Sequence, residues 1–365
     1  WGFSQSPPFG STINLTTPRS FADPWIDYPG GNPFPFTATA DTPFPLQSQF
    51  LTHPLHPKHV YANQWNLSVQ QAIGTDWMAS VNYIGNNLIH MTTSDLLDPG
   101  VYIPGSSTLA NLPQRRVLYL QNPQEGQYYG KIDGLKDDGT SSYNAGMISI
   151  QRRRSKGLTL QANYTWSHCV ADYLDPFVGG PAGRSYMVPG DRRRDRANCG
   201  SDRRHTLNTS TVYETPLFSN SAVRTVASGW RVSGILRIQS GTWLTPVTGL
   251  DNALSGQQDQ RPNQALLDVY AAGKNDDLWI NAAAYAQPAT GTYGNAGRLS
   301  VLGPGSIRID MGLTRTFHVR ENQTVDLRVE AFNLPNHVNA GNPNTTLNNQ
   351  NFGRILSAGD PRLMQ

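Results

Sequence analysis

Apolar and polar residues alternate at every second position over several stretches, and this feature restricts the fold more than any other. Between Leu158 and Ser167, Leu, Leu, Ala, Tyr and Trp alternate with Thr, Gln, Asn, Thr and Ser. Successive side chains of a β-strand point to opposite faces, so the pattern predicts a strand with one apolar and one polar face. Helical spacing of apolar residues is nearly absent. The sequence therefore predicts an all-β protein.

Four pairs of alternating strands are predicted. They cover residues 64–70 with 77–83, 141–154 with 158–167, 204–213 with 230–239, and 307–317 with 324–333. Most of these strands approach about ten residues, the length that a tilted strand needs to cross a bilayer. Strands of soluble sandwiches are usually shorter, about 5–6 residues. The strand length favours an antiparallel transmembrane β-barrel.

The connections differ in length at the two ends of the strands. Connections within pairs are short, apart from residues 216–228, whereas those between pairs are long. The long ones cover residues 91–140, 169–203, 241–306 and 335–354. Outer-membrane barrels have short periplasmic turns and long extracellular loops. We therefore expect Gly74, Lys156, Ser221 and Glu321 on the periplasmic side and the long loops outside the cell.

Aromatic residues fall where such strands would meet the membrane surfaces. In this orientation Trp77, Trp230 and Phe317 lie at the periplasmic interface, and Trp166 and Trp243 lie near the outer one. Outer-membrane barrels carry an aromatic girdle at each interface. The arrangement predicts that the protein resides in the bacterial outer membrane, with its lipid as a partner.

The polar positions of the strands would then face a wet lumen. The candidates for lining it are Asn66, Ser68, Gln161, Asn163, Arg231, Arg237, Asp310 and Arg328. Asp310 and Glu330 share their predicted face with Arg308 and Arg328, so we expect a ladder of paired charges there and not a pair of catalytic carboxylates.

Composition excludes several other classes of protein. The mean hydropathy is −0.46, and no run reaches the about 18 apolar residues of a spanning helix. The net charge of +3 is too small and scattered to indicate nucleic acid as a partner. A soluble sandwich or propeller is the alternative fold. Loops of this length are uncommon in compact soluble domains, and no propeller repeat is present.

The two cysteines, Cys169 and Cys199, lie in one polar stretch. Neither has the neighbouring Cys or the spaced His residues of a zinc site. Two interpretations remain open. The cysteines are incidental thiols, or they form one disulfide that closes a loop in an oxidising compartment.

The segment 191–204 is dense in Arg and Asp. Its candidates for binding an anion in the outer loops are Arg192, Arg193, Arg194 and Arg196. Guanidinium groups bind carboxylates and phosphates in two-pronged fashion. The simpler interpretation is a solvated loop in which Asp191, Asp195 and Asp202 pair with the arginines.

Signals for catalysis or metal binding are weak. His53, His56 and His59 are evenly spaced, but Pro54 and Pro57 prevent a helix that would gather them on one face. A nucleophile elbow and a phosphate loop are both missing from the sequence. We therefore predict no cofactor, no metal site and no enzymatic activity.

Several short sequence segments resemble those of one known family, and they occur in the same order. They are residues 21–25 (FADPW), 28–35, 64–70 (QWNLSVQ), 142–145, 157–160, 164–167, 202–205, 229–234 (GWRVSG), 239–243, 291–297, 303–305, 330–333 (EAFN), 351–354 and 357–362. Together they resemble the C-terminal part of the barrel of Oar-like TonB-dependent transporters, over nearly everything after residue 20.

The resemblance implies a larger parent protein with a plug and a 22-stranded barrel, the size class of about 22 strands known for plugged transporters. Residues 59–365 would supply about eight to ten of these strands, and residues 1–58 would be a Pro/Gly-rich extracellular loop segment. The sequence has no plug and no TonB box, so we expect a fragment. Implied partners are the plug, the remaining strands, TonB and an unknown solute. The alternative function is a binding or adhesion module for polysaccharide or cell surfaces.

Overall fold

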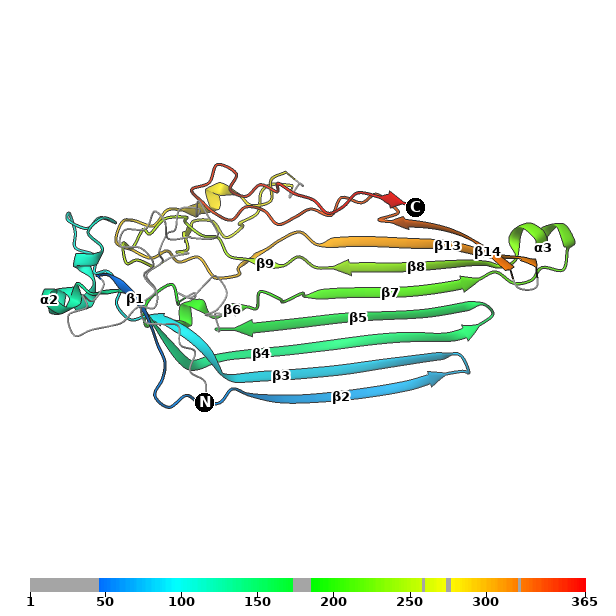
Figure 1. Ribbon diagram of the computed structural model, residues 1–365, viewed down its shortest axis with the longest axis horizontal. Coiled ribbons are helices and arrows are strands. Elements are labelled where there is room, and N and C mark those ends of the chain that lie inside the picture. The colour runs from blue at the N-terminus through cyan, green and yellow to red at the C-terminus, as the bar shows by residue number, and fades with distance from the viewer. Residues whose placement is uncertain (1–45, 173–184, 258–259, 274–276, 321–322) are drawn as a thin grey trace, which may run out of the picture.

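The computed structural model describes residues 46–172, 185–257, 260–273, 277–320 and 323–365. Its eight long strands form one antiparallel sheet and run along the longest axis of the molecule (Figure 1). The long strands are β2 (Tyr61–Ile73), β3 (Trp77–Leu96), β4 (Tyr129–Ser155), β5 (Leu158–Ala171), β7 (His205–Glu214), β8 (Trp230–Gln239), β13 (Ser306–Arg320) and β14 (Gln323–Phe332).

Short elements accompany this sheet. The short strands are β1 (Ser48–Thr52), β6 (Ala197–Asn198), β9 (Trp243–Leu244), β10 (Asn263–Gln264), β11 (Tyr285–Ala286), β12 (Val301–Leu302) and β15 (Leu363–Met364). The helices are α1 (Val117–Gln121), α2 (Pro123–Gly126) and α3 (Ser221–Ala227), with 3-10 turns η1 (Pro113–Arg115), η2 (Arg192–Asp195) and η3 (Ala282–Ala284). None of the helices in the described ranges is long and apolar enough to cross a membrane.

The strand order β15-β14-β13-β8-β7-β5-β4-β3-β2 confirms the predicted all-β antiparallel architecture. Each predicted pair forms a hairpin, and successive hairpins pair with each other. Over the described residues the sheet is open, because β2 and β15 stand at its two ends and do not pair with each other. β1 lies in the segment expected to be an extracellular loop and pairs in parallel with β4. Residues 1–45 of that segment lie outside the described ranges.

The connection expected over residues 91–140 is shorter than predicted. β3 and β4 continue into it, with Met91 paired to Gly139 and Leu96 to Asp133. Thr93, Ser94 and Asp95 are buried in this extension. Because loops cover the extension with polar contacts, its sequence lacks the apolar alternation that marks the rest of the hairpin.

The register produces a continuous apolar face. Directly paired residues on neighbouring strands point to the same side of a sheet. One row across seven strands consists of Val69, Val81, Ile148, Tyr164, Leu207, Ile238 and Ile307. Val69 is 61% exposed and Val81 58% exposed. We call this side the apolar face; it turns its hydrophobic side chains outward.

The main hydrophobic core cluster lies in the long connections. It consists of Val269, Ile280, Ala284, Tyr285, Ala296, Val301 and Phe352. These residues belong to the long connections, which gather with α1 and α2 at one end of the strands, the loop end (Figure 1). α3 lies at the opposite, short-turn end. A sheet with an exposed apolar face and a separately packed loop layer is unlike a soluble sandwich, which buries that face.

Candidate functional site: the polar face of the sheet

The side of the sheet opposite the apolar face is polar, and we call it the polar face. Its paired residues form continuous rows across neighbouring strands, as those of the apolar face do. Asn163 pairs with Ser149 and with Asn208; Asn208 pairs with Arg237, which pairs with Arg308. All eight residues predicted to line a lumen occupy this face. The others, placed by the alternation of their strands, are Asn66, Ser68, Gln161, Arg231, Asp310 and Arg328.

Charges on the polar face are paired along the strands. Arg308 Nε lies 3.0 Å from an oxygen of Asp310, and Arg328 contacts Glu330 two positions further along its own strand. Arg237 Nε donates to the Asn208 side chain over 3.2 Å. Every second position of a strand lies on one face, so these pairs leave their charges on the polar surface. The face is hydrophilic and its charges are partly neutralised.

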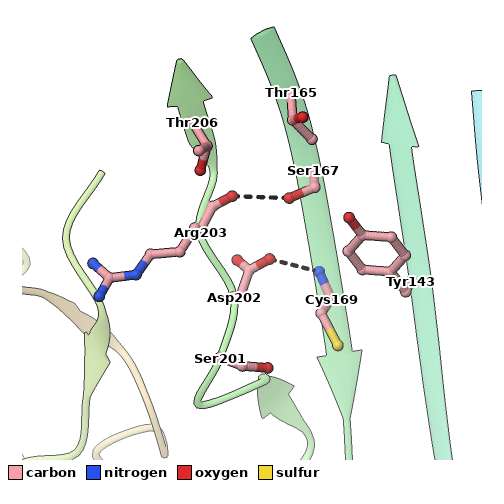
Figure 2. Close-up of a pocket in the computed structure, with 8 residues that line it drawn as sticks. All are labelled: Tyr143, Thr165, Ser167, Cys169, Ser201, Asp202, Arg203 and Thr206. Atoms are coloured by element: carbon pink, nitrogen blue, oxygen red, sulfur yellow. Dashed lines mark hydrogen bonds between the residues drawn. The ribbon is translucent and has the colours of Figure 1, made fainter. Parts of the chain in front are cut away.

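A pocket of about 270 Å³ opens on the polar face at the loop end (Figure 2). Its lining residues are Tyr143, Thr165, Ser167, Cys169, Ser201, Asp202, Arg203 and Thr206. Ser167 Oγ donates to the carbonyl of Arg203 over 2.8 Å, which fixes the loop wall against β5. Sequence reasoning missed this pocket, because the loop residues that close it carry no pattern of their own.

Asp202 connects the strand and the loops that form the pocket wall. Its buried carboxylate accepts from the backbone N–H of Cys169 over 2.8 Å and from Trp243 Nε1 over 3.0 Å. Arg204 lies 3.7 Å from the same carboxylate and stands over the Trp243 ring. Trp243, predicted for the outer aromatic girdle, is half-buried and contacts the loop layer through Asp202. The prediction missed Asp202 as its partner because the two are distant in sequence.

The structure joins Cys169 and Cys199 in a disulfide, with Cα atoms 5.3 Å apart. The backbone N–H of Cys199 donates to the carbonyl of Cys169 over 3.0 Å. Of the two interpretations left open by the sequence, the structure contains the disulfide. It ties the segment around η2 to the end of β5, beside the pocket.

Two of the four candidate anion-binding arginines are engaged in ion pairs. Arg192 lies 3.4 Å from Asp172 and 3.5 Å from Asp138. Arg196 lies 3.8 Å from Asp172. Arg193 and Arg194 are exposed. Arg192 and Arg196 pair with aspartates outside the segment, because the loop folds against β4 and β5. Arg204 pairs with Asp202 within the segment, as the simpler interpretation predicted.

Asp195, expected to pair within its own segment, instead contacts the buried Arg261. Asp195 is 1% exposed and Arg261 4% exposed. Arg261 also donates to the carbonyls of Ala296 and Arg194, over 2.8 and 2.9 Å. Arg298 donates to the Asp195 carbonyl, and burial lowers the pKa of Arg298. Arg261 therefore links its own loop to the loops that carry Asp195 and Ala296.

Four of the five aromatic girdle candidates lie on the apolar face. Trp166 stands towards the loop end, and Trp77, Trp230 and Phe317 stand at the short-turn end. Two further aromatic side chains, Trp65 and Tyr83, are exposed on this face towards the loop end. The sequence marked them as apolar-face residues without assigning them to a girdle.

The separation of the aromatic bands suits a membrane. Trp166 and Leu158 are eight residues apart on β5; Leu158 pairs with Tyr213, which pairs with Val232, two residues from Trp230. The two bands are therefore separated by about 33 Å along the strands, at roughly 3.3 Å per residue. At the tilt of about 40° that is usual for such barrels, the band is about 25 Å tall, the height of an outer-membrane apolar belt.

Among the described residues, no group of three His, Cys, Asp or Glu side chains could hold a metal ion. The evenly spaced His53, His56 and His59 are all exposed. The polar face and its pocket offer hydrogen bonds and paired charges, which suit contact with a polar solute or another polar surface.

Residues 1–365 match the family described as outer membrane beta barrel domain. No curated protein sequence matches the chain. Several solved structures are similar to it at low identity, among them the following three.

The outer membrane transporter YddB of Escherichia coli is 11% identical, with a TM-score of 0.46, 86% of this chain covered and 33% of that one. The FrpB iron transporter of Neisseria meningitidis is 9% identical, with a TM-score of 0.40 and coverages of 86% and 31%. The closed form of the ferric-catecholate import receptor Fiu of Escherichia coli is 10% identical, with a TM-score of 0.39 and coverages of 84% and 27%.

The chain thus spans about a third or less of the length of these proteins. The family match covers the whole sequence and agrees with an antiparallel sheet whose apolar face is exposed. The chain belongs to the outer membrane β-barrel domain family and resides in the bacterial outer membrane.

Proposed function

We propose that this chain is part of the wall of a plugged, TonB-dependent transporter barrel of the Oar-like kind, and that its polar face lines the path of a solute. One observation carries the proposal. The row through Asn163, Asn208 and Arg237 is polar across neighbouring strands, whereas the row one residue away, through Tyr164, Leu207 and Ile238, is apolar. Such alternation separates a wet lumen from lipid.

On this proposal the apolar face holds the wall in the membrane and the polar face contacts the plug and the passing solute. The free edge of β2, and that of β14 outside its short pairing with β15, pair with further strands, since lipid cannot satisfy unpaired backbone groups. Residues 59–365 supply the wall, and residues 1–58 contribute to the extracellular loops. TonB acts through a plug region of the larger protein.

The pocket beside Ser167 and Asp202 would be the first polar contact for a solute that enters from the loop end. Its hydroxyl groups donate and accept, and therefore suit a solute rich in hydrogen-bonding groups. The exposed Arg193 and Arg194 add positive charge at the same end, which would favour anionic solutes.

Uptake by whole cells tests the proposed function. Cells that express the full-length protein are offered a panel of labelled anionic, neutral and cationic solutes, with and without an uncoupler of the proton-motive force. The proposal predicts accumulation of at least one solute class that the uncoupler abolishes. Binding at the cell surface that ignores the uncoupler would overturn it and would favour adhesion.

A polar-face variant sharpens the same assay. Arg237 and Arg308 are directly paired on neighbouring strands and place two positive charges side by side on the polar face. Replacing both by Gln removes two positive charges from the solute path, so uptake of anionic solutes should fall relative to neutral ones. The matched control is Ile238→Leu on the apolar face, which should leave the ratio unchanged.

A further inference from the structure

The connection between β7 and β8, residues 215–229, is longer than a barrel turn needs. It contains α3, a short helix whose two ends both form hydrogen bonds with side chains. Asn220 caps the first turn of α3 by accepting from the backbone N–H groups of Ala222 and Val223. At the other end, Arg315 donates to the carbonyls of Thr225 and Val226. Side chains that satisfy both ends stabilise a short helix that would otherwise be marginal.

The groups that hold α3 show on which side of the wall it lies. Trp230 Nε1 donates to the Val226 carbonyl over 2.7 Å, and Arg315 stands over the rings of Trp230 and Phe317 at 5.3 and 4.7 Å. Trp230 pairs directly with Arg315, and both belong to the apolar face. α3 lies at the short-turn end (Figure 1). Its contacts with Trp230 and Arg315 therefore attach it on the side of the apolar face.

The exposed surface of this connection is amphipathic. Val226 is 70% exposed and Leu217 79% exposed, and Val223 is also exposed. At about 100° per residue, Val223 and Val226 lie about 60° apart on the helix, with Arg224 opposite them. Residues 215–229 contain Arg224 and no acidic residue.

We propose that α3 and Leu217 insert their apolar side chains into the periplasmic leaflet of the outer membrane, as a monotopic anchor for this edge of the wall. The occupant of the exposed surface is phospholipid. The apolar surface of α3 continues the apolar face through Trp230 and Phe317, which stand where ring systems gather at a membrane interface. The exposed Arg224 adds a positive charge, which anionic lipid headgroups favour beside an interfacial helix.

Depth-dependent quenching tests the anchor. The full-length protein is placed in vesicles of phosphatidylethanolamine and phosphatidylglycerol, with an environment-sensitive fluorophore on Val226→Cys. The native cysteines are disulfide-bonded in the structure and do not compete for the label. Ser221→Cys is the matched control, about 140° away on the same helix. Heat-modifiable migration verifies that each variant is folded, and Val223→Cys provides a second site on the apolar side.

The proposal predicts loss of fluorescence at positions 226 and 223 when nitroxide-labelled lipid is present, and loss at position 221 only with aqueous iodide. Equal quenching of all three positions by iodide would overturn it. A label at 226 that lipid nitroxides do not reach in vesicles, but that native membranes shield from iodide, would also overturn it, because a protein would then be the occupant. Neither result depends on uptake of a solute, so the anchor and the transport function fail separately.

Discussion

The buried ion pair between Asp195 and Arg261 illustrates how single residues secure the loop layer. Replacing Arg261 by Met leaves the Asp195 carboxylate buried without its cation, and removing one partner of such a pair costs about 3–5 kcal/mol. We expect faster chymotrypsin cleavage of the loops on intact cells. The control is Arg193→Gln, because Arg193 is exposed. Equal cleavage of both variants would contradict this role for the pair.

Asp98 gives the loop layer a pH dependence of its own. Burial raises the pKa of Asp98 above its ordinary value of 3.8, against the lowering effect of the Leu118 N–H and Arg116. The folded state therefore binds this proton more tightly than the unfolded state. Its stabilising contribution is complete below pH 3.8 and is lost as the pH rises through the raised folded pKa.

Replacing Asp98 by Asn tests this sign. The amide oxygen still accepts from Leu118 N, at the position where Asp98 accepts over 2.9 Å, and no charge needs to be desolvated. Hydrogen exchange around η1 and α1 should become slower at pH 7 and should change little near pH 4. A variant that exchanges faster at pH 7 would show that the Arg116 attraction outweighs burial.

At the scale of elements, the disulfide is the covalent link between the sheet and the loop layer. Cys169 and Cys199 are 30 residues apart, and a native disulfide of this kind stabilises by about 2–4 kcal/mol. Replacing both cysteines by Ser should expose Tyr186 to chymotrypsin, since the connection loses its tie to β5. Heat-modifiable migration should be unchanged, because the strand pairs remain. Loss of that migration would instead make the disulfide a requirement of the barrel itself.

The elements divide by how well the sequence predicts them. The four hairpins follow from period-two alternation, because each strand has one face in contact with an apolar medium and one with a polar one. The extension of β3 and β4 beyond residue 90 has no such asymmetry and was missed. α3 was missed as well, since seven residues carry too little periodicity to predict a helix.

At the scale of the whole molecule, hydrophobic groups are distributed in two unrelated ways. The apolar face presents Val69, Val81 and Ile148 outward, whereas the core formed by Val269, Ile280 and Phe352 is enclosed by the loops. The first distribution is typical of a surface in contact with lipid. The second is typical of a domain in water, which buries its apolar side chains. One sequence pattern therefore predicts the wall, but the loop layer depends on contacts between residues far apart in the chain.

The candidate site follows the same division. The alternation placed Asn163, Arg237 and the other lumen candidates on one face, as the register does. The pocket at Ser167 depends on Asp202 and Arg203 folding back over β5, which local pattern does not encode. The buried partner of Asp195 lies 66 residues away, so no spacing rule could have found it.

Thiol accessibility of two neighbouring positions on β5 tests the two-faced wall most directly. Ala162 pairs with Ile150 on the apolar face, and Asn163 pairs with Ser149 on the polar face. In the full-length protein, Asn163→Cys should react with a charged, membrane-impermeant thiol reagent, whereas Ala162→Cys should react only with a lipid-soluble maleimide. Equal reaction of both positions with the charged reagent, in protein that still shows heat-modifiable migration, would contradict the account.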